Sequence, residues 1–467
     1  MTVNPSPQES RRPLGRTGLS CHPLGFGCYR IAEGIADHEA ALRLYLEKGG
    51  NLIDTSSNYT DGSSETLVGT TIKDISPKDV IMVTKAGYIQ GQNMTLAQSR
   101  SFPEVVHYGE GLWHCIHPDF LETQITRSSQ RLGIECLDVF LLHNPEYFLS
   151  HRSHQGKVTP ADHDEFYRRI AGAFSFLESQ VSAGRIRWYG ISSNHFGMPL
   201  SDPTMTSVSR CLEQALSVSS NHHFAVVQLP VNLFEPGGAL HVNNEGLTCL
   251  EFCEQHGLGV LANRPLNSFH RNQLIRLADF TVAGAEPPGI EELVKLLSPL
   301  ETAEKALAVH CDGTLMHGNT GLAEHLQHIV PQVPSPDHWD AVFQRYILPP
   351  LQSWIAQVQG SIAAPDVRKQ ALDQFFRTLS STFEEVERFL RSKQQVVSDQ
   401  VRQSLLQAGY PKTDSTLSQM AVNVLLRLKG MSCVLIGMRR PTYVQDAFGS
   451  LALGPVASHA ILRRLAQ

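Results

Sequence analysis

Four side chains in the sequence have the chemical types that, if brought together, assist reduction of a carbonyl group. Asp54 ends NLID, Tyr59 stands five residues later, Lys85 ends VIMVTK, and His143 ends VFLLH. The pKa of a free tyrosine hydroxyl is ~10, so it needs a neighbouring cation to donate a proton near neutral pH. A lysine held by an aspartate supplies that cation, and a histidine can donate a hydrogen bond to the carbonyl oxygen as it gains negative charge. This combination meets what hydride reduction of an aldehyde or ketone needs: a proton donor and stabilisation of the negative charge that develops on oxygen.

Taken singly, each of these four residues has an ordinary structural explanation. An aspartate after a strand usually caps a helix, a lysine there usually lies at the rim, and a histidine after an apolar run is usually a satisfied polar group. The catalytic interpretation therefore depends on whether the fold brings the four side chains together.

The elements that would position them alternate regularly from residue 23 to about residue 262. The expected strands are 23–28, 51–55, 80–85, 137–143, 186–192, 224–229 and 257–263. The expected helices between them are 37–49, 64–73, 118–132, 163–183, 206–218 and 244–256. Nearly continuous apolar strands that alternate with helices are typical of a parallel sheet covered by helices.

An eighth strand, 431–437, follows only after a long gap, between expected helices at 418–428 and 441–451. Eight such units predict an α/β fold, a (β/α)8 TIM barrel, rather than a doubly wound sheet, and no GxGxxG turn follows the first strand. Active sites of TIM barrels lie where the strands end, which is where Asp54 and His143 fall.

The gap predicts a large α-helical insertion between the seventh strand and the helix that follows it. Apolar residues recur with helical spacing over 367–391, which predicts a long amphipathic helix. Residues 281–410 hold 10 Lys+Arg and 15 Asp+Glu, so they carry nearly all of the net charge of −6. A lid, an oligomer contact, a partner surface and a simple appendage all stay open as its role. The expected organisation is a flexible tail (1–11), the first part of the barrel (12–279), the helical insertion (280–410) and the closing part of the barrel (411–467).

Composition excludes several classes of protein. The chain of 467 residues is 42% hydrophobic with a pI near 6.4, which argues against a disordered chain and against a dedicated nucleic-acid binder. No apolar run reaches the ~20 residues of a membrane span, and the N-terminus lacks a signal-peptide pattern, so a soluble, cytoplasmic protein is expected. Nine scattered cysteines predict free thiols. HCIH (114–117) has metal-ligand spacing without a second ligand pair, so no metal site is expected.

Several motifs in the right order give the sequence a family resemblance. RPLGRTGLSCHPLGFGCYRI (12–31), NLIDTSSNYTDGSSETLVG (51–69), VTKAGY and LLHNPEY together resemble the aldo-keto reductase family. The resemblance implies a TIM barrel and NADPH-dependent carbonyl chemistry. It also implies that Asp54, Tyr59, Lys85 and His143 form the catalytic set, with Tyr59 as the proton donor.

The same resemblance implies a set of cofactor-binding residues. In WYGISSNHF (188–196), Ser192 or Ser193 aligns with the family serine and Asn194 with its asparagine; with Gln228, these hold the nicotinamide carboxamide. NRPLN (263–267) stands where the family has an aromatic residue that stacks on the nicotinamide, here replaced by Asn263 or Arg264. The remaining implied contacts are with the adenosine half: Arg439 and Arg440 with the ribose 2′-phosphate, and Asp446 with the adenine. NADP(H) is therefore expected rather than NAD(H).

The sequence thus predicts an NAD(P)H-dependent oxidoreductase acting on a small-molecule aldehyde, ketone, sugar or alcohol. No nucleic acid or membrane partner is expected, and a homo-oligomer through the insertion is a possibility. The long loop 86–117 is expected to overhang the catalytic face. The alternative is a non-catalytic barrel that binds a nicotinamide nucleotide and acts as a redox sensor or regulatory subunit through its insertion.

Overall fold

The computed structural model describes residues 11–467 except 77, 271–272, 281–289, 310–312, 314, 317–319, 334 and 361–364. The expected flexible tail therefore lies, apart from Arg11, outside the described residues. The chain divides into two compact units. The barrel unit comprises the chain up to Leu277 together with Leu405–Gln467, and the helical unit is Ala278–Ser404. The expected insertion, 280–410, extends six residues further, because 405–410 belong to the barrel unit.

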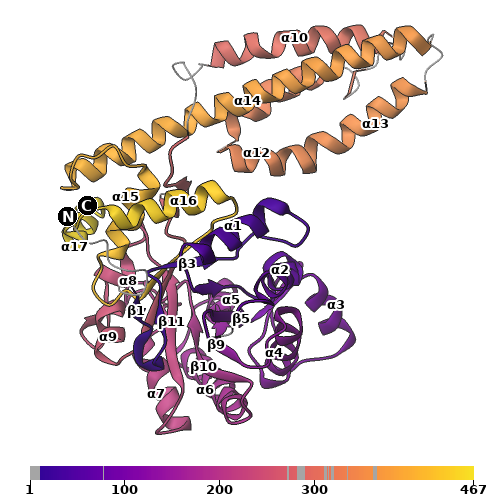
Figure 1. Cartoon of the computed structure of the whole chain (residues 1–467). Coiled ribbons are helices and arrows are strands. Elements are labelled where there is room, and N and C mark those ends of the chain that lie inside the picture. The colour runs from indigo at the N-terminus through magenta and orange to yellow at the C-terminus, as the bar shows by residue number, and fades with distance from the viewer. Residues whose placement is uncertain are drawn as a thin grey trace. The chain divides into compact units, whose positions relative to one another are not determined.

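Eight parallel strands close into a barrel, which confirms the predicted (β/α)8 fold (Figure 1). The ring runs in the order β3-β4-β5-β9-β10-β11-β14-β17, and β17 pairs with β3 to close it. The strands are β3 (Leu24–Gly27), β4 (Leu52–Asp54), β5 (Ile81–Ala86), β9 (Leu137–His143), β10 (Ile186–Ser192), β11 (Phe224–Pro230), β14 (Gly259–Asn263) and β17 (Cys433–Ile436). Almost every strand residue is buried, as the continuous apolar runs require.

The helices that alternate with these strands begin and end close to the expected residues. They are α1 (Ala36–Glu47), α2 (Ser63–Ile72), α4 (Pro118–Leu132), α6 (Pro160–Ser182), α7 (Val208–Val218), α9 (Cys249–Gln255), α15 (Leu417–Leu426) and α16 (Pro441–Gly449). The expectation of a helix over 244–256 was wrong at its start. Glu245 and Gly246 turn with positive φ between the short strands β12 (Val242–Asn244) and β13 (Leu247–Thr248), and a capping box of Thr248 and Glu251 starts α9.

A hairpin of β1 (Arg12–Pro13) and β2 (Ser20–Cys21) lies at the N-terminal ends of the barrel strands. Arg16, in the turn between them, donates hydrogen bonds to the carbonyl oxygens of His222 (3.1 Å) and Phe224 (2.6 Å) at the start of β11. Leu14 and Cys21 of this segment are fully buried in the apolar cluster that fills the barrel. The hairpin therefore covers the N-terminal end of the barrel. The opposite end, where the strands have their carboxyl ends, is the end at which active sites of TIM barrels lie.

The expected loop 86–117 contains structure that the sequence patterns did not predict. It folds into α3 (Gln92–Ser99) and a three-stranded antiparallel sheet of β6 (Tyr88–Ile89), β8 (Leu112–His114) and β7 (Val106–Gly109). A small core holds this segment together, consisting of Ile89, Phe102, Cys115 and Phe120. After β9, a further short helix, α5 (Tyr147–Gln155), begins.

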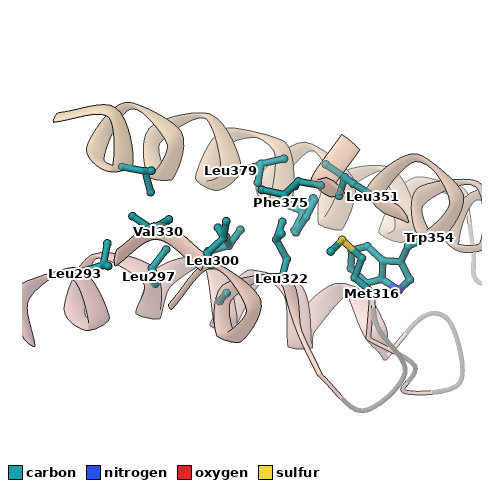
Figure 2. Packing of buried hydrophobic residues seen from close by; sticks show 14 of the residues in the cluster. Leu293, Leu297, Leu300, Met316, Leu322, Val330, Leu351, Trp354, Phe375 and Leu379 are labelled. Carbon is teal, nitrogen blue, oxygen red and sulfur yellow. The ribbon is translucent and has the colours of Figure 1, made fainter. Parts of the chain in front are cut away.

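The helical unit has an apolar core of its own. Its helices are α10 (Ile290–Ala308), α11 (Leu322–Ile329), α12 (Pro336–Val342), α13 (Leu348–Gln359) and most of α14 (Pro365–Gln407), which contains the expected helix 367–391. Leucines of α10, Trp354 of α13 and Phe375 of α14 belong to one buried cluster, in which Trp354 lies beside Met316 (Figure 2). Among the residues that the structure describes, no helix is long and apolar enough to cross a membrane.

The chain enters and leaves the helical unit at neighbouring points. Arg402, near the end of the unit, forms an ion pair with Asp279, near its start, at 2.9 Å. The Ser398 hydroxyl donates a hydrogen bond to the carbonyl oxygen of Ala278 at 2.6 Å. These two contacts therefore hold the first and last residues of the helical unit together.

Candidate active site

A buried ion pair lies at the carboxyl ends of β4 and β5. The Nζ atom of Lys85 is 2.8 Å from Oδ2 of Asp54 and donates a second hydrogen bond to the carbonyl oxygen of Thr55 at 2.6 Å. Burial disfavours the ammonium group, but Asp54 and Tyr59 outweigh this effect and raise the pKa of Lys85. Lys85 therefore stays charged at neutral pH.

Tyr59 lies beside this ion pair, at the start of the short 3-10 turn Tyr59–Gly62. Lys85 Nζ is 4.7 Å from the centre of the Tyr59 ring. Burial raises the pKa of Tyr59 to about 12, while Lys85 acts in the opposite direction through its charge and a hydrogen bond. Lys85 thus lowers the pKa of Tyr59, as expected of a neighbouring cation, but burial is the larger effect and the net shift is upward.

His143 ends β9 and completes the group of four. Its ring meets the Tyr59 ring edge-on with 5.9 Å between centres, and its Nδ1 atom lies 3.0 Å from the Ser56 hydroxyl oxygen. Burial, and then the charge of Lys85, lower the pKa of His143 well below its usual value. The imidazole is therefore neutral. The structure thus brings Asp54, Tyr59, Lys85 and His143 together, as their order along the strands predicted.

Aromatic side chains from the loop 86–117 and from α5 surround His143. The Tyr88 ring lies edge-on to the His143 ring at 4.7 Å between centres, and its hydroxyl accepts a hydrogen bond from Asn144 Nδ2 at 2.6 Å. His114 Nε2 lies 2.7 Å from the carbonyl oxygen of His143, and its ring stacks on Tyr147. Burial lowers the pKa of His114 to about 4. The sequence patterns did not single out Asn144 or Tyr147, because they meet His143 only through tertiary packing.

The HCIH segment serves packing and capping. His114 contacts the carbonyl oxygen of His143. His117 accepts a hydrogen bond from the backbone N–H of Asp119 at the start of α4, at 3.3 Å. Within the described ranges, no three His, Cys, Asp or Glu side chains are grouped so that they could hold a metal ion.

Of the residues expected to hold the nicotinamide carboxamide, Gln228 contacts the ion pair directly. Gln228 in β11 donates a hydrogen bond from Nε2 to Asp54 Oδ1 at 2.8 Å, and its Oε1 accepts one from the Ser192 hydroxyl at 2.9 Å. The backbone N–H of Asn194 donates to Oε1 of the buried Glu146 at 2.8 Å. Gln228 therefore links Ser192 to Asp54, a connection that no sequence spacing indicated.

The residues expected at the adenosine end lie in the loop after β17 and in α16. Arg440 is exposed, and its Nε atom lies 3.9 Å from Oδ2 of Asp37. Arg439 is half-buried. Asp446 accepts hydrogen bonds from the Thr416 hydroxyl at 2.7 Å, from Gln419 Nε2 at 3.1 Å and from the Ser418 hydroxyl. Its carboxylate therefore stabilises the start of α15, a role that the sequence did not predict.

Three buried polar atoms at the carboxyl ends of barrel strands accept or donate no hydrogen bond within the described part of the chain. They are Ser57 Oγ after β4, Glu146 Oε2 after β9 and Asn263 Oδ1 at the end of β14. Buried polar atoms nearly always have partners. A ligand that carries amide and hydroxyl groups, such as a nicotinamide nucleoside, fits atoms of this kind.

This geometry can be compared with known proteins. Residues 23–273, more than half of the chain, match the sequence profile of the aldo/keto reductase family. The chain belongs to this family.

The chain is 27% identical to the NADH-specific methylglyoxal reductase of Escherichia coli (strain K12) over 189 residues, which are 39% of this chain and 51% of that relative. It is 28% identical over 187 residues to the aldo-keto reductase yakc of Schizosaccharomyces pombe, whose name specifies NADP(+), covering 38% and 45%. The chain thus spans about half the length of these curated relatives. A solved aldo-keto reductase from Bacillus halodurans, in its holo form, superposes with a TM-score of 0.49 at 16% identity, covering 98% of this chain and 96% of that chain.

Proposed function

We propose that this aldo/keto reductase transfers a hydride between a nicotinamide nucleotide and the carbonyl carbon of an aldehyde, ketone or sugar, with Tyr59 as the proton donor. The observation that carries the proposal is the buried ion pair of Asp54 and Lys85 beside the Tyr59 ring. Removing two charges from water costs several kcal/mol per ion, so a buried pair next to a tyrosine and a neutral histidine fits proton transfer better than simple packing.

Each residue has a defined part in this proposal. The Tyr59 hydroxyl donates its proton to the carbonyl oxygen, and the charge of Lys85 stabilises the phenolate that is left. Asp54 holds Lys85 in place, and neutral His143 orients the carbonyl oxygen by a hydrogen bond. When bound, the reduced nicotinamide supplies the hydride. In the reverse direction, the Tyr59 phenolate accepts the proton of the alcohol.

For the cofactor, we propose that Ser192, Asn194 and Gln228 bind the nicotinamide carboxamide. We propose NADP(H) rather than NAD(H), with Arg439 and Arg440 binding the 2′-phosphate beside the start of α16 and with Asp446 near the adenine. Two guanidinium groups beside the start of α16, which begins at Pro441, support an anion there. The relatives' names include both an NADH-specific and an NADP(+) enzyme, so the preference needs a direct measurement.

The test is titration of the purified protein with NADPH and NADH, followed by a screen of aldehydes, ketones and sugars for oxidation of the reduced cofactor. Tyr59→Phe is expected to lower turnover by ~10²–10⁴-fold while the Kd for the nucleotide stays within about twofold, because the hydroxyl acts only on the reacting carbonyl. The exposed Tyr346, in the helical unit, provides the matched control Tyr346→Phe. A Tyr59→Phe variant with near-normal turnover would exclude the proton-donor role.

Two features favour the alternative, a non-catalytic nucleotide sensor. The helical unit, Ala278–Ser404, is separate from the barrel unit, and Asn263 at the end of β14 stands where the family has the aromatic residue that stacks on the nicotinamide. The same titration separates the two functions, because a sensor binds the nucleotide but oxidises it with no member of the substrate panel. A cytoplasmic location and a homo-oligomer through the helical unit stay predictions.

A further inference from the structure

Asn263, the last residue of β14, is in contact with the polar network of the candidate site. Its Nδ2 atom donates a hydrogen bond to Gln228 Oε1 at 3.4 Å, and β14 pairs with β11 so that Asn263 lies opposite Pro230. Gln228 in turn contacts Asp54 and Ser192. Asn263 is therefore one side chain removed from the buried ion pair.

The donors and acceptors around Gln228 fix the orientation of the Asn263 amide. Because Gln228 Nε2 donates to Asp54, its Oε1 is the acceptor, and both lone pairs of Oε1 are used, by the Ser192 hydroxyl and by Asn263 Nδ2. Asn263 must therefore direct its NH2 group toward Gln228 and its Oδ1 atom elsewhere. Oδ1 is buried and accepts no hydrogen bond from the residues that the structure describes. Such an unsatisfied acceptor costs ~1–3 kcal/mol.

The backbone at this position is held in place by contacts that do not involve the Asn263 amide. Arg264 follows with φ of 51°, a left-handed conformation that is unfavourable for a residue other than glycine. Its carbonyl oxygen accepts a hydrogen bond from Asn232 Nδ2 at 3.2 Å, and its guanidinium forms an ion pair with Glu235 at 3.0 Å. The turn therefore presents Asn263 in a fixed position, as a preformed binding group requires.

We propose that Asn263 Oδ1 accepts a hydrogen bond from the carboxamide NH2 group of the bound nicotinamide nucleotide, an inference that rests on the proposed function. A carboxamide offers one acceptor and two donors. Gln228 has one N–H left for the carboxamide oxygen, but its own oxygen is fully used, so it cannot accept from the carboxamide nitrogen. Asn263 Oδ1 supplies the acceptor that Gln228 lacks. Gln228 and Asn263 thereby contact the oxygen and the nitrogen of the same amide, in addition to the contacts proposed for Ser192 and Asn194.

The experiment measures the Kd of two nucleotides for two proteins. The nucleotides are NADPH and its 3-acetylpyridine analogue, which keeps the C=O group but carries CH3 in place of NH2. The proteins are the wild type and Asn263→Leu, which removes the acceptor at similar volume. Asn263→Leu is expected to weaken NADPH by ~2–10-fold and to leave the analogue within about twofold, as the loss of one hydrogen bond requires. Asn221→Ala, at an exposed asparagine just before β11, serves as the control.

With a folded variant, the other binding outcomes overturn the inference. Equal weakening of both nucleotides, or no weakening of either, shows that Asn263 does not contact the carboxamide nitrogen. A change only in the KM of the carbonyl substrate assigns Asn263 to the substrate instead. If thermal unfolding shows that Asn263→Leu is not folded, Asn263→Ala replaces it, and the wild type alone must bind NADPH more tightly than the analogue. Failure of the wild type to bind NADPH or NADH overturns the proposed function itself, which separates the two.

Discussion

Burial raises the pKa of Tyr59, and the charge of Lys85 opposes this rise. Lys85 donates to Asp54 and to the carbonyl oxygen of Thr55, and its ammonium is the cation nearest to Tyr59 among the contacts described. With a pKa of about 12, Tyr59 is protonated at neutral pH. The proton donor for carbonyl reduction is therefore available over the whole physiological range, whereas the phenolate needed for alcohol oxidation is scarce.

We expect Lys85→Met to affect the two directions of the reaction differently. Below its pKa, the phenolate fraction of Tyr59 rises tenfold per pH unit, so wild-type oxidation should increase up to about pH 12. Removal of Lys85 raises the pKa of Tyr59 further, so oxidation at pH 9–10 should fall by at least ~tenfold. The rate of reduction should fall as well, without a new pH dependence. The pH–rate profiles of both directions provide the measurement, with the exposed Lys429→Met as control; an unshifted alkaline limb would contradict the role of Lys85.

At this scale the sequence predicted which residues meet but not how their environment acts on them. Residue types at strand ends were sufficient to select Asp54, Lys85 and His143. The net rise in the pKa of Tyr59 depends on burial, and the Gln228 contact with Asp54 depends on the curvature of the closed barrel. Neither quantity has a signature in residue spacing.

At the scale of elements, Asp446 connects α16 to the start of α15. Asp446→Ala removes a hydrogen-bond acceptor shared by Thr416, Ser418 and Gln419. It also removes a negative charge that interacts favourably with the positive, N-terminal end of the α15 dipole. We expect the free energy of unfolding to fall by ~1–3 kcal/mol. Urea unfolding measures the change, and the exposed Asp414→Ala is the control. Unchanged stability would show that the network does not stabilise α15.

The loop between β17 and α16 should determine the choice of nucleotide. Changing Arg439 and Arg440 together to alanine removes charge-assisted contacts with a 2′-phosphate, each of which contributes ~1.5–3 kcal/mol. The ratio of the NADPH and NADH dissociation constants should therefore change by tenfold or more. Arg463→Ala, at an exposed arginine of the terminal helix α17 (Ser458–Leu465), is the control. Equal weakening of both nucleotides would mean that these arginines do not recognise the 2′-phosphate.

The elements that lie in continuous apolar runs or show helical periodicity were predictable, and the small antiparallel sheet was not. The strands of the barrel and helices such as α4 (Pro118–Leu132) follow from apolar runs and helical periodicity. The sheet of β6, β7 and β8 consists of strands of two to four residues, whose pairing is stabilised by a small tertiary core. Such strands are too short to show a period of their own.

At the scale of the molecule, the helical unit should be removable. The buried cluster of this unit draws its described members from residues 293–390, and the Asp279–Arg402 ion pair brings the two ends of the unit together. Replacing 278–404 with a short Gly/Ser linker is therefore expected to leave a folded barrel whose Tm stays within ~5 °C of the barrel transition in the full chain. Calorimetry of both proteins measures this, with an equal linker inserted between 277 and 278 of the full chain as control. Loss of cooperative unfolding would show that the barrel depends on the unit.

The position of the helical unit also sets the order in which the barrel becomes complete during synthesis. β14 ends at Asn263, and β17, which pairs with both β14 and β3, begins at Cys433. At ~5–20 residues per second, a ribosome needs on the order of ten seconds to make the chain between them. Through that interval the nascent barrel has seven strands and therefore two unpaired edge strands. Unpaired edge strands can pair with other chains or be bound by chaperones. Shortening the segment between β14 and β17 should therefore reduce chaperone occupancy on the nascent chain, even where the stability of the finished protein does not change.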